Sequence, residues 1–136
     1  MKVALRWLDM VVYLVFLGFV LLTGVRITLW YAGLALSFAS ALFWFAARWQ
    51  LGASFSVQAE ARQLVTSGLY SKFRHPVYVF STAAWVGVLV ALLGVQGVVI
   101  GLIVVVVQIL RARREDRVLA QAFGSEYVAY RASTWF

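Results

Sequence analysis

Three long runs without a charged residue constrain this chain more than any other feature of its sequence. They cover residues 10–25, 27–47 and 76–110, and they are 16, 21 and 35 residues long. A helix that crosses the hydrocarbon core of a bilayer needs about 20 mostly apolar residues. Hydrophobic residues make up 64% of the chain, against roughly 45–50% in soluble domains. The runs therefore predict a small integral membrane protein and exclude a water-soluble globule.

The third run is too long for one crossing. As a single helix it would extend for roughly 52 Å at about 1.5 Å per residue, well beyond the hydrocarbon core of about 30 Å. Residues 94–97, which read Gly-Val-Gln-Gly, provide a turn that folds this run into a tight helical hairpin. We therefore expect an all-α integral membrane protein with four transmembrane helices and a cytoplasmic amphipathic C-terminal helix. Its expected elements, within a single membrane domain 1–136, are spans at about 5–24, 28–47, 76–93 and 97–113, a cytoplasmic loop at 48–75 and a tail helix at 114–131.

The basic residues predict how these spans are oriented. In the four-span arrangement, Arg26 falls on one side of the membrane and all other Lys and Arg residues on the opposite side. The positive-inside rule places that richer side, with both termini, the loop and the tail, in the cytoplasm. Its position beside an anionic leaflet accounts for the net charge of +7 without a nucleic acid. The residues on this side are Lys2, Arg6, Arg48, Arg62, Lys72, Arg74, Arg111, Arg113, Arg114, Arg117 and Arg131.

The composition limits the chemistry that such a protein can carry. The chain has no Cys and one His, which excludes thiolate chemistry and a His-cluster metal site, so we predict no metal. The outer turns are too short to hold a site. Any polar site is therefore expected in the cytoplasmic loop or tail, and either a bacterial inner membrane or the endoplasmic reticulum would suit it.

The loop ends in the most informative stretch of the chain, residues 68–78. Pro76 is expected to be the first helical residue of the third span, where its missing N–H costs nothing. The free N–H groups of that first turn, together with Arg74 and a protonated His75, would form an anion site. The alternative is that Lys72 and Arg74 are membrane anchors and that His75 is a neutral interfacial residue.

The tail carries two neighbouring acids, Glu115 and Asp116, inside a basic cluster. Neighbouring helix residues point about 100° apart, so the two carboxylates are expected to take different roles. The alternative is a solvated ion-pair network in which Arg111 pairs with Glu115 and Arg113 with Asp116. Further along, an apolar stripe that Gly124 weakens suggests a helix lying on the bilayer or on its own protein; it comprises Leu119, Ala122, Phe123, Tyr127 and Tyr130.

Gly97 and Gly101 form a small-xxx-small face in the last apolar stretch. Such a face lets two helices approach closely. It predicts either close packing inside the helical hairpin or a homo-oligomer of the chain.

Two blocks of sequence match a known pattern. The first, Gly68-Leu69-Tyr70 followed by Arg74-His75-Pro76-Val77-Tyr78, resembles G-x-Y…R-H-P-x-Y. The second resembles E-E-x-x-L…F-G-x-x-Y-x-x-Y and consists of Glu115-Asp116-x-x-Leu119 and Phe123-Gly124-x-Glu126-Tyr127-x-x-Tyr130. The order, the spacing and the helical hairpin between the blocks also agree. The chain thus resembles the integral membrane methyltransferases that include isoprenylcysteine carboxyl methyltransferase and phospholipid N-methyltransferases, with Asp116 where a second Glu is usual and Leu69 where Pro is common.

The resemblance implies S-adenosylmethionine-dependent methyl transfer at the cytoplasmic face of the membrane. The acceptor would be lipophilic, either isoprenylcysteine-carboxylate-like or phospholipid-amine-like, and would enter from the bilayer. The implied catalytic residues are Arg74, His75 and Tyr78, and Arg74 and Arg131 would bind the acceptor. The implied cofactor-binding residues are Tyr70, His75, Pro76, Tyr78, Glu115 and Asp116.

Two other classes of function are compatible with the sequence. A small four-helix transporter generally needs an ionisable residue inside the membrane. Only Asp9 approaches that depth, and Arg6 lies one turn away, where the two are expected to neutralise each other. A non-catalytic membrane assembly partner is the other alternative, and binding of S-adenosylmethionine would separate the enzyme from both.

Overall fold

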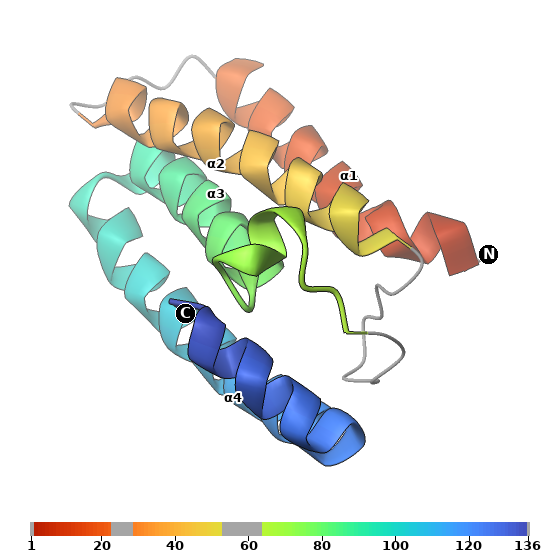
Figure 1. The fold of residues 1–136 in the computed structure, drawn as a ribbon. Helices are drawn as coiled ribbons and strands as arrows, with labels where there is room; N and C mark the ends of the chain where they lie inside the picture. The colour runs from red at the N-terminus through yellow and green to blue at the C-terminus, as the bar shows by residue number, and fades with distance from the viewer. Residues whose placement is uncertain (1, 23–28, 53–63, 136) are drawn as a thin grey trace.

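A computed structural model describes residues 2–22, 29–52 and 64–135, with only the backbone for residues 2–6. Within these ranges the chain is all-helical (Figure 1). The elements are α1 (Lys2–Leu22), α2 (Trp30–Leu51), the short 3-10 helix η2 (Gly68–Ser71), α3 (Pro76–Leu93) and α4 (Val95–Ser133). The sequence therefore correctly predicted an all-helical chain, although α2 ends four residues later than the expected second span.

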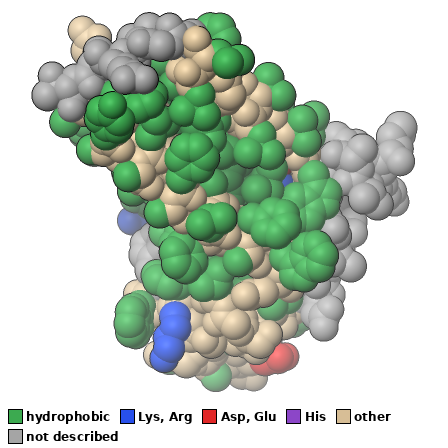
Figure 2. All heavy atoms as spheres, turned by 90° about the horizontal axis from the view of Figure 1, so that it is seen from above, with side chains coloured by type: hydrophobic (Ala, Val, Ile, Leu, Met, Phe, Trp, Pro, Cys, Tyr) green, Lys and Arg blue, Asp and Glu red, His purple; other side chains and the backbone are tan. Residues whose placement is uncertain are grey.

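Three of the described helices, α2, α3 and α4, are long and apolar enough to cross a membrane. The apolar part of α1, Trp7–Leu22, is shorter. The outward faces carry large hydrophobic side chains, such as Val15 and Leu42, which are 70% and 74% exposed. Figure 2 shows one such face, which is mostly hydrophobic with few charged side chains. The chain is a membrane protein by these criteria, and the fourth span stays a prediction.

The contact between α2 and α3 depends on two glycines that face each other. A β-carbon on Gly33 would lie 2.5 Å from the backbone nitrogen of Ala91, and one on Gly87 would lie 2.6 Å from the carbonyl oxygen of Gly33. Next to them, the Ser37 hydroxyl contacts the carbonyl oxygen of Ala84 at 3.0 Å and the Tyr13 hydroxyl at 2.5 Å. Because Tyr13 belongs to α1, these contacts join the first three helices.

The hairpin between α3 and α4 turns at a single residue, Gly94, which has a φ of 59°. α4 begins directly after it, at Val95, two residues earlier than expected. Gly97 and Gly101 are buried against α3, where a β-carbon on Gly101 would lie 3.0 Å from the Val86 side chain. Both glycines thus serve packing inside the hairpin, the first of the two expected uses, and association of copies of the chain stays a prediction.

An ion pair between a buried Arg48 and a half-exposed Asp9 joins α1 to the end of α2. The Arg48 guanidinium donates two hydrogen bonds to the Asp9 carboxylate and is 1% exposed. Its carbon Cζ lies 5.9 Å from the ring centroid of Trp7 and 5.5 Å from that of Trp44. The expected partner of Asp9, Arg6, has a side chain outside the described residues. The structure shows instead a partner that lies 39 positions away in the sequence.

The expected tail helix at 114–131 is interrupted at one residue. Gly124 has φ 52° and ψ −123°, which is not a helical conformation, and the chain reverses there (Figure 1). The hydroxyl of Tyr127 consequently donates a hydrogen bond to Asp116, although eleven residues of straight helix would separate them by about 16 Å. The expected single stripe is therefore split, with Tyr127 and Tyr130 buried and Ala122 exposed.

We expect the substitution Gly33→Ala to lower the stability of the protein by about 1–3 kcal/mol, because the added methyl group forces α2 and α3 apart. Gly18→Ala in α1 is the matched control, since nothing lies within 4 Å of its β-carbon. It should be neutral or stabilising by up to about 1 kcal/mol through helix propensity. Thermal unfolding in detergent measures both changes, and equal melting temperatures for the two variants would contradict this account of the interface.

Candidate active site

The loop before α3 is fixed by the end of α2. Gly68, with a φ of 62°, packs against the Gln50 side chain, and the backbone N–H of Leu69 donates to Gln50 Oε1 at 2.8 Å. These contacts start η2 and bury Tyr70. Residues 72–75 follow η2, and Pro76 occupies the first position of α3. The loop therefore presents Arg74 and His75 at the start of α3 in a defined position.

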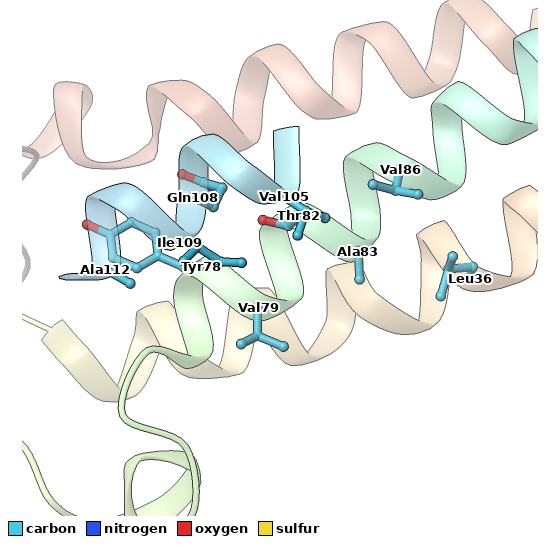
Figure 3. A pocket seen from close by; sticks show the side chains of 10 residues that line it. All are labelled: Leu36, Tyr78, Val79, Thr82, Ala83, Val86, Val105, Gln108, Ile109 and Ala112. Carbon is cyan, nitrogen blue, oxygen red and sulfur yellow. The ribbon is translucent and has the colours of Figure 1, made fainter. Parts of the chain in front are cut away.

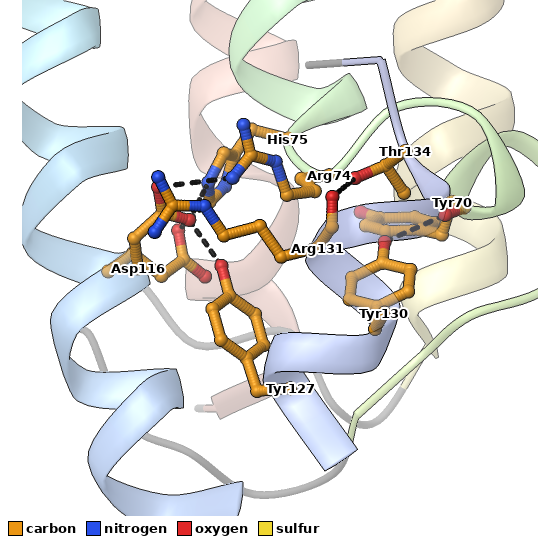
Figure 4. A network of polar contacts seen from close by, with 9 residues as sticks. Tyr70, Arg74, His75, Asp116, Tyr127, Tyr130, Arg131 and Thr134 are labelled. Carbon is orange, nitrogen blue, oxygen red and sulfur yellow. Dashed lines mark hydrogen bonds and ion pairs between the residues drawn. The ribbon is translucent and has the colours of Figure 1, made fainter. Parts of the chain in front are cut away.

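The carboxylate of Asp116 contacts side chains from two other segments of the chain (Figure 4). His75 Nε2 lies 2.7 Å from Asp116 Oδ1, and the Tyr127 hydroxyl donates to the same oxygen. Arg74 Nη1 lies 3.7 Å from the other oxygen, Oδ2. An acid on α4 thus connects the loop before α3 with the returning tail.

The imidazole of His75 lies between two acids. Its Nδ1 atom is 3.7 Å from Glu115 Oε2, too far for a hydrogen bond, whereas Nε2 contacts Asp116. An ionised carboxylate only accepts hydrogen bonds, so His75 donates to Asp116 through a proton on Nε2. The other ring nitrogen, Nδ1, then lies on the side of Glu115.

The tail is fastened to the loop at two further points. The Tyr130 hydroxyl donates to the carbonyl oxygen of Tyr70 at 2.7 Å. The backbone N–H of Trp135 donates to the carbonyl oxygen of Lys72 at 2.9 Å. The Trp135 ring also packs edge-on against Phe73. Residues 125–135 therefore cover one side of the polar cluster.

Arg74 retains unused hydrogen-bond donors inside this cluster. Its side chain is only 16% exposed, and among the described residues neither Nε nor Nη1 has a hydrogen-bond partner. Arg131 adds a second positive charge nearby, because its side chain reaches from the tail toward Asp116 (Figure 4) and its charge acts on Tyr127. The two guanidinium groups make this region suited to an anion.

Tyr78 marks the boundary between the polar cluster and an apolar cavity. Its hydroxyl lies within hydrogen-bonding reach of Glu115, and the Arg111 Cζ atom lies 5.8 Å from its ring centroid. On its other side lies a cavity of about 360 Å³, whose walls come from α3 and α4 with Leu36 of α2 (Figure 3). Most of the lining is aliphatic, as at Val86, Val105 and Ile109. The polar cluster and the apolar cavity therefore meet at the ring of Tyr78.

A family model described as phospholipid methyltransferase matches residues 26–126, about three quarters of the chain. The chain belongs to the phospholipid methyltransferase family. No curated protein and no solved structure matches it. Membership makes the chain a membrane methyltransferase at the level of the family, in agreement with the resemblance stated from its two sequence blocks. The matched range contains Arg74, His75, Glu115 and Asp116 and ends just before Tyr127.

The structure brings together the residues that the sequence singled out for this phospholipid methyltransferase family member. Pro76 follows Arg74 and His75 directly, and the Tyr78 ring lies 5.7 Å from the His75 ring. Glu115 and Asp116 face His75 from α4, and the charge of Glu115 acts on Tyr70. In the described part of the chain, Asp116 pairs with Arg74 and His75 rather than with Arg113.

Sequence reasoning missed several residues of the site in this family member. Tyr127 and Tyr130 were recognised only as members of the apolar tail stripe and of the second sequence block. Their spacing was the only sign that they belong to the site. Gln50, which fixes the loop, and Thr82 and Gln108, which line the cavity, gave none. An isolated polar residue in or near an apolar helix has no distinctive pattern.

Hydrogen bonds and charges decide the ionisation of the cluster. Burial opposes ionisation of Asp116, but the hydrogen bonds from Tyr127 and His75 and the nearby positive charges outweigh it, so the pKa of Asp116 lies below its ordinary value. Burial and the Asp116 carboxylate raise the pKa of Tyr127 above its ordinary value. Burial likewise raises the pKa of Tyr130 to about 12. At neutral pH both tyrosines therefore stay protonated and act as donors, Tyr127 to the ionised Asp116 and Tyr130 to the carbonyl oxygen of Tyr70.

The lowered pKa of Asp116 predicts how the stability of the protein depends on pH. The stabilisation by the ionised carboxylate is complete above the ordinary Asp pKa of about 3.9 and is lost as the pH falls through the lower folded-state value. The melting temperature of the wild type should therefore exceed that of Asp116→Asn by a constant amount from about pH 7 to about pH 5. The difference should shrink below about pH 4. A difference that grows on acidification would contradict the assignment.

Proposed function

We propose that this protein is an S-adenosylmethionine-dependent methyltransferase that acts on a lipophilic acceptor at the cytoplasmic face of the membrane. The observation that carries the proposal is the largely buried Arg74 guanidinium, which keeps unused donors, lies 3.7 Å from the Asp116 carboxylate and belongs to a polar cluster that borders an apolar cavity at Tyr78. The orientation, with both termini, the loop and the tail in the cytoplasm, belongs to the proposal and rests on the distribution of Lys and Arg.

The charges of the cluster suit the proposed cofactor. Arg74, with Nε and Nη1 available, would hold the cofactor carboxylate, helped by the free N–H groups at the start of α3. Glu115, whose side chain is 33% exposed, would accept hydrogen bonds from the ammonium group or the ribose hydroxyls. The Tyr78 ring would face the sulfonium through a cation–π contact. When bound, the cofactor supplies a methyl group on a positively charged sulfur.

The residues of the chain would act mainly by alignment and by excluding water. Direct displacement needs the acceptor atom in line with the methyl group, and Tyr78 at the mouth of the cavity is placed to orient an acceptor whose lipophilic part lies inside. A carboxylate or thiolate acceptor needs no base. An amine acceptor must lose a proton, and Nδ1 of His75, freed by the contact of Nε2 with Asp116, is the group that would take it.

Neutralising the two acids is expected to weaken cofactor binding unequally. Asp116 already contacts His75, Arg74 and Tyr127, so Asp116→Asn should act indirectly, by displacing Arg74 and His75. Glu115 is more exposed, so Glu115→Gln should remove a direct contact with the cofactor. The stronger variant should lose about 1.5–3 kcal/mol, which raises the Kd roughly ten- to a hundredfold. Calorimetry with S-adenosylmethionine and S-adenosylhomocysteine in detergent measures this.

Glu126→Gln is the matched control for this experiment, because Glu126 is an exposed acid on the tail. It should bind the cofactor as the wild type does. If Glu115→Gln and Asp116→Asn also bind like the wild type, the acids are a structural ion-pair network and the proposal fails.

Arg74→Lys is expected to reduce turnover, although it keeps the charge. A lysine cannot reproduce the planar fork with which a guanidinium grips a carboxylate, so alignment should suffer while membrane insertion is unchanged. His75→Ala should remove a limb of the pH–rate profile near neutrality for an amine acceptor, and should affect mainly binding for a carboxylate or thiolate acceptor. Radiolabelled methyl transfer to a panel of acceptors gives both readouts.

Arg117→Lys, at an exposed position of the same charged region, is the control for Arg74→Lys and should be silent. If Arg74 were only a membrane anchor, its lysine variant would be silent as well. Normal methylation by both Arg74→Lys and His75→Ala in well-folded protein would exclude this cluster as the active site.

A further inference from the structure

Two hydrogen-bond donors meet on a single oxygen of Asp116. His75 Nε2 lies 2.7 Å from Oδ1, and the Tyr127 hydroxyl donates to the same atom (Figure 4). The second oxygen, Oδ2, lies 3.7 Å from Arg74 Nη1, which is beyond hydrogen-bonding distance. An ionised carboxylate offers about four lone-pair positions on its two oxygens, so a shortage of acceptors does not force the two donors together. Their meeting on Oδ1 is set by where the chain places them.

The tail that carries Tyr127 has docking contacts of its own. Tyr127 is 1% exposed and follows the chain reversal at Gly124. The tail is also held against the loop by the hydrogen bond from the Tyr130 hydroxyl to the carbonyl oxygen of Tyr70 and by the backbone N–H of Trp135. The effect of the Tyr127 hydroxyl on Asp116 can therefore be separated from the docking of the tail.

A shared acceptor couples the two donors. A hydrogen bond to a carboxylate stabilises its ionised form, and it draws on the same negative charge that attracts a second donor. A protonated imidazole gains more from this carboxylate than a neutral one, because a hydrogen bond between two charged groups is the stronger of the two. The Tyr127 hydroxyl on Oδ1 therefore reduces the stabilisation that Asp116 gives to the protonated form of His75.

Four further charged or titratable side chains lie around His75. They are Glu115 on α4, Tyr78 on α3, Arg74 in the same loop and Arg131, which reaches from the tail toward Asp116 (Figure 4). Glu115 is on the far side of the imidazole, with its Oε2 atom 3.7 Å from Nδ1. Of the described side chains, Tyr127 is the one that shares Oδ1 with His75.

We propose that Tyr127 is a positioning residue that acts on His75 through Asp116. By donating to Oδ1, its hydroxyl limits how strongly the carboxylate holds the protonated imidazole, so the reversed tail sets the proton affinity of the site. The use of this proton affinity in catalysis rests on the proposed function, because an amine acceptor must give its proton to His75. The coupling itself needs neither cofactor nor acceptor, and it can be measured in the protein alone.

The single His of the chain makes this coupling directly measurable. In detergent-solubilised protein with isotope-labelled histidine, one imidazole NMR signal reports the pH at which His75 takes up its proton. Tyr127→Phe keeps the buried ring and removes the donor, so this titration midpoint should rise by about 0.5–1 pH unit relative to the wild type. Replacing Tyr127 by a fluorotyrosine, whose hydroxyl is a stronger donor, should lower the midpoint instead. A midpoint that fails to rise in the first variant, or that fails to fall in the second, would overturn the proposal.

Tyr130→Phe is the matched control. It removes a second buried hydroxyl from the same tail, but that hydroxyl donates to the carbonyl oxygen of Tyr70 rather than to Asp116. The titration midpoint of His75 should therefore stay at its wild-type value, even if the melting temperature falls as it does in Tyr127→Phe. An equal shift in the two variants would reveal a general effect of loosening the tail and would overturn the specific role of Tyr127.

A double-mutant cycle identifies the route of the coupling. In an Asp116→Asn background the shared carboxylate is gone, so Tyr127→Phe should no longer shift the titration midpoint of His75. A shift that persists in that background would mean that Tyr127 acts on His75 without Asp116, which contradicts the proposal. Failure of the proposed function would appear separately, as the absence of S-adenosylmethionine binding by calorimetry, whereas the titration of His75 needs no cofactor.

Discussion

The charge-assisted hydrogen bonds to Asp116 hold the polar half of this protein together. One carboxylate, on the charged part of α4, receives His75 from the loop and Tyr127 from the returning tail, and lies opposite Arg74. Hydrogen bonds to an ionised group are roughly twice as strong as neutral ones. The tautomer of His75, the direction of Arg74 and the position of the tail all follow from this one acceptor.

The apolar part of the fold could be predicted from sequence to within a few residues. Uncharged runs of sufficient length specify helices directly, and Gly94 in the middle of the longest run marks the hairpin turn. The two sequence blocks also identified the segments that form the candidate site. Hydropathy and local spacing carry these signals, and both are properties of short stretches of chain.

The contacts between distant residues could not be predicted in the same way. Asp9 has a plausible local partner in Arg6, and nothing in the sequence favours Arg48. Gly124 is compatible with a weakened helix and with a reversal, and the choice is made by tertiary contacts of Tyr127, Tyr130 and Trp135. Each of these features depends on three-dimensional neighbours rather than on residue type.

The reversal at Gly124 has a consequence for the order in which the protein matures. Domains form during synthesis from the N-terminal side, at about 5–20 residues per second. α1 to α3 can therefore enter the bilayer and pack before Tyr127 is synthesised. The loop that carries Arg74 and His75 receives two of its hydrogen bonds only from Tyr130 and Trp135. A nascent chain that stopped near Gly124 would be an inserted helical bundle with an unfastened site. In this protein, insertion and completion of the site are separate events in time.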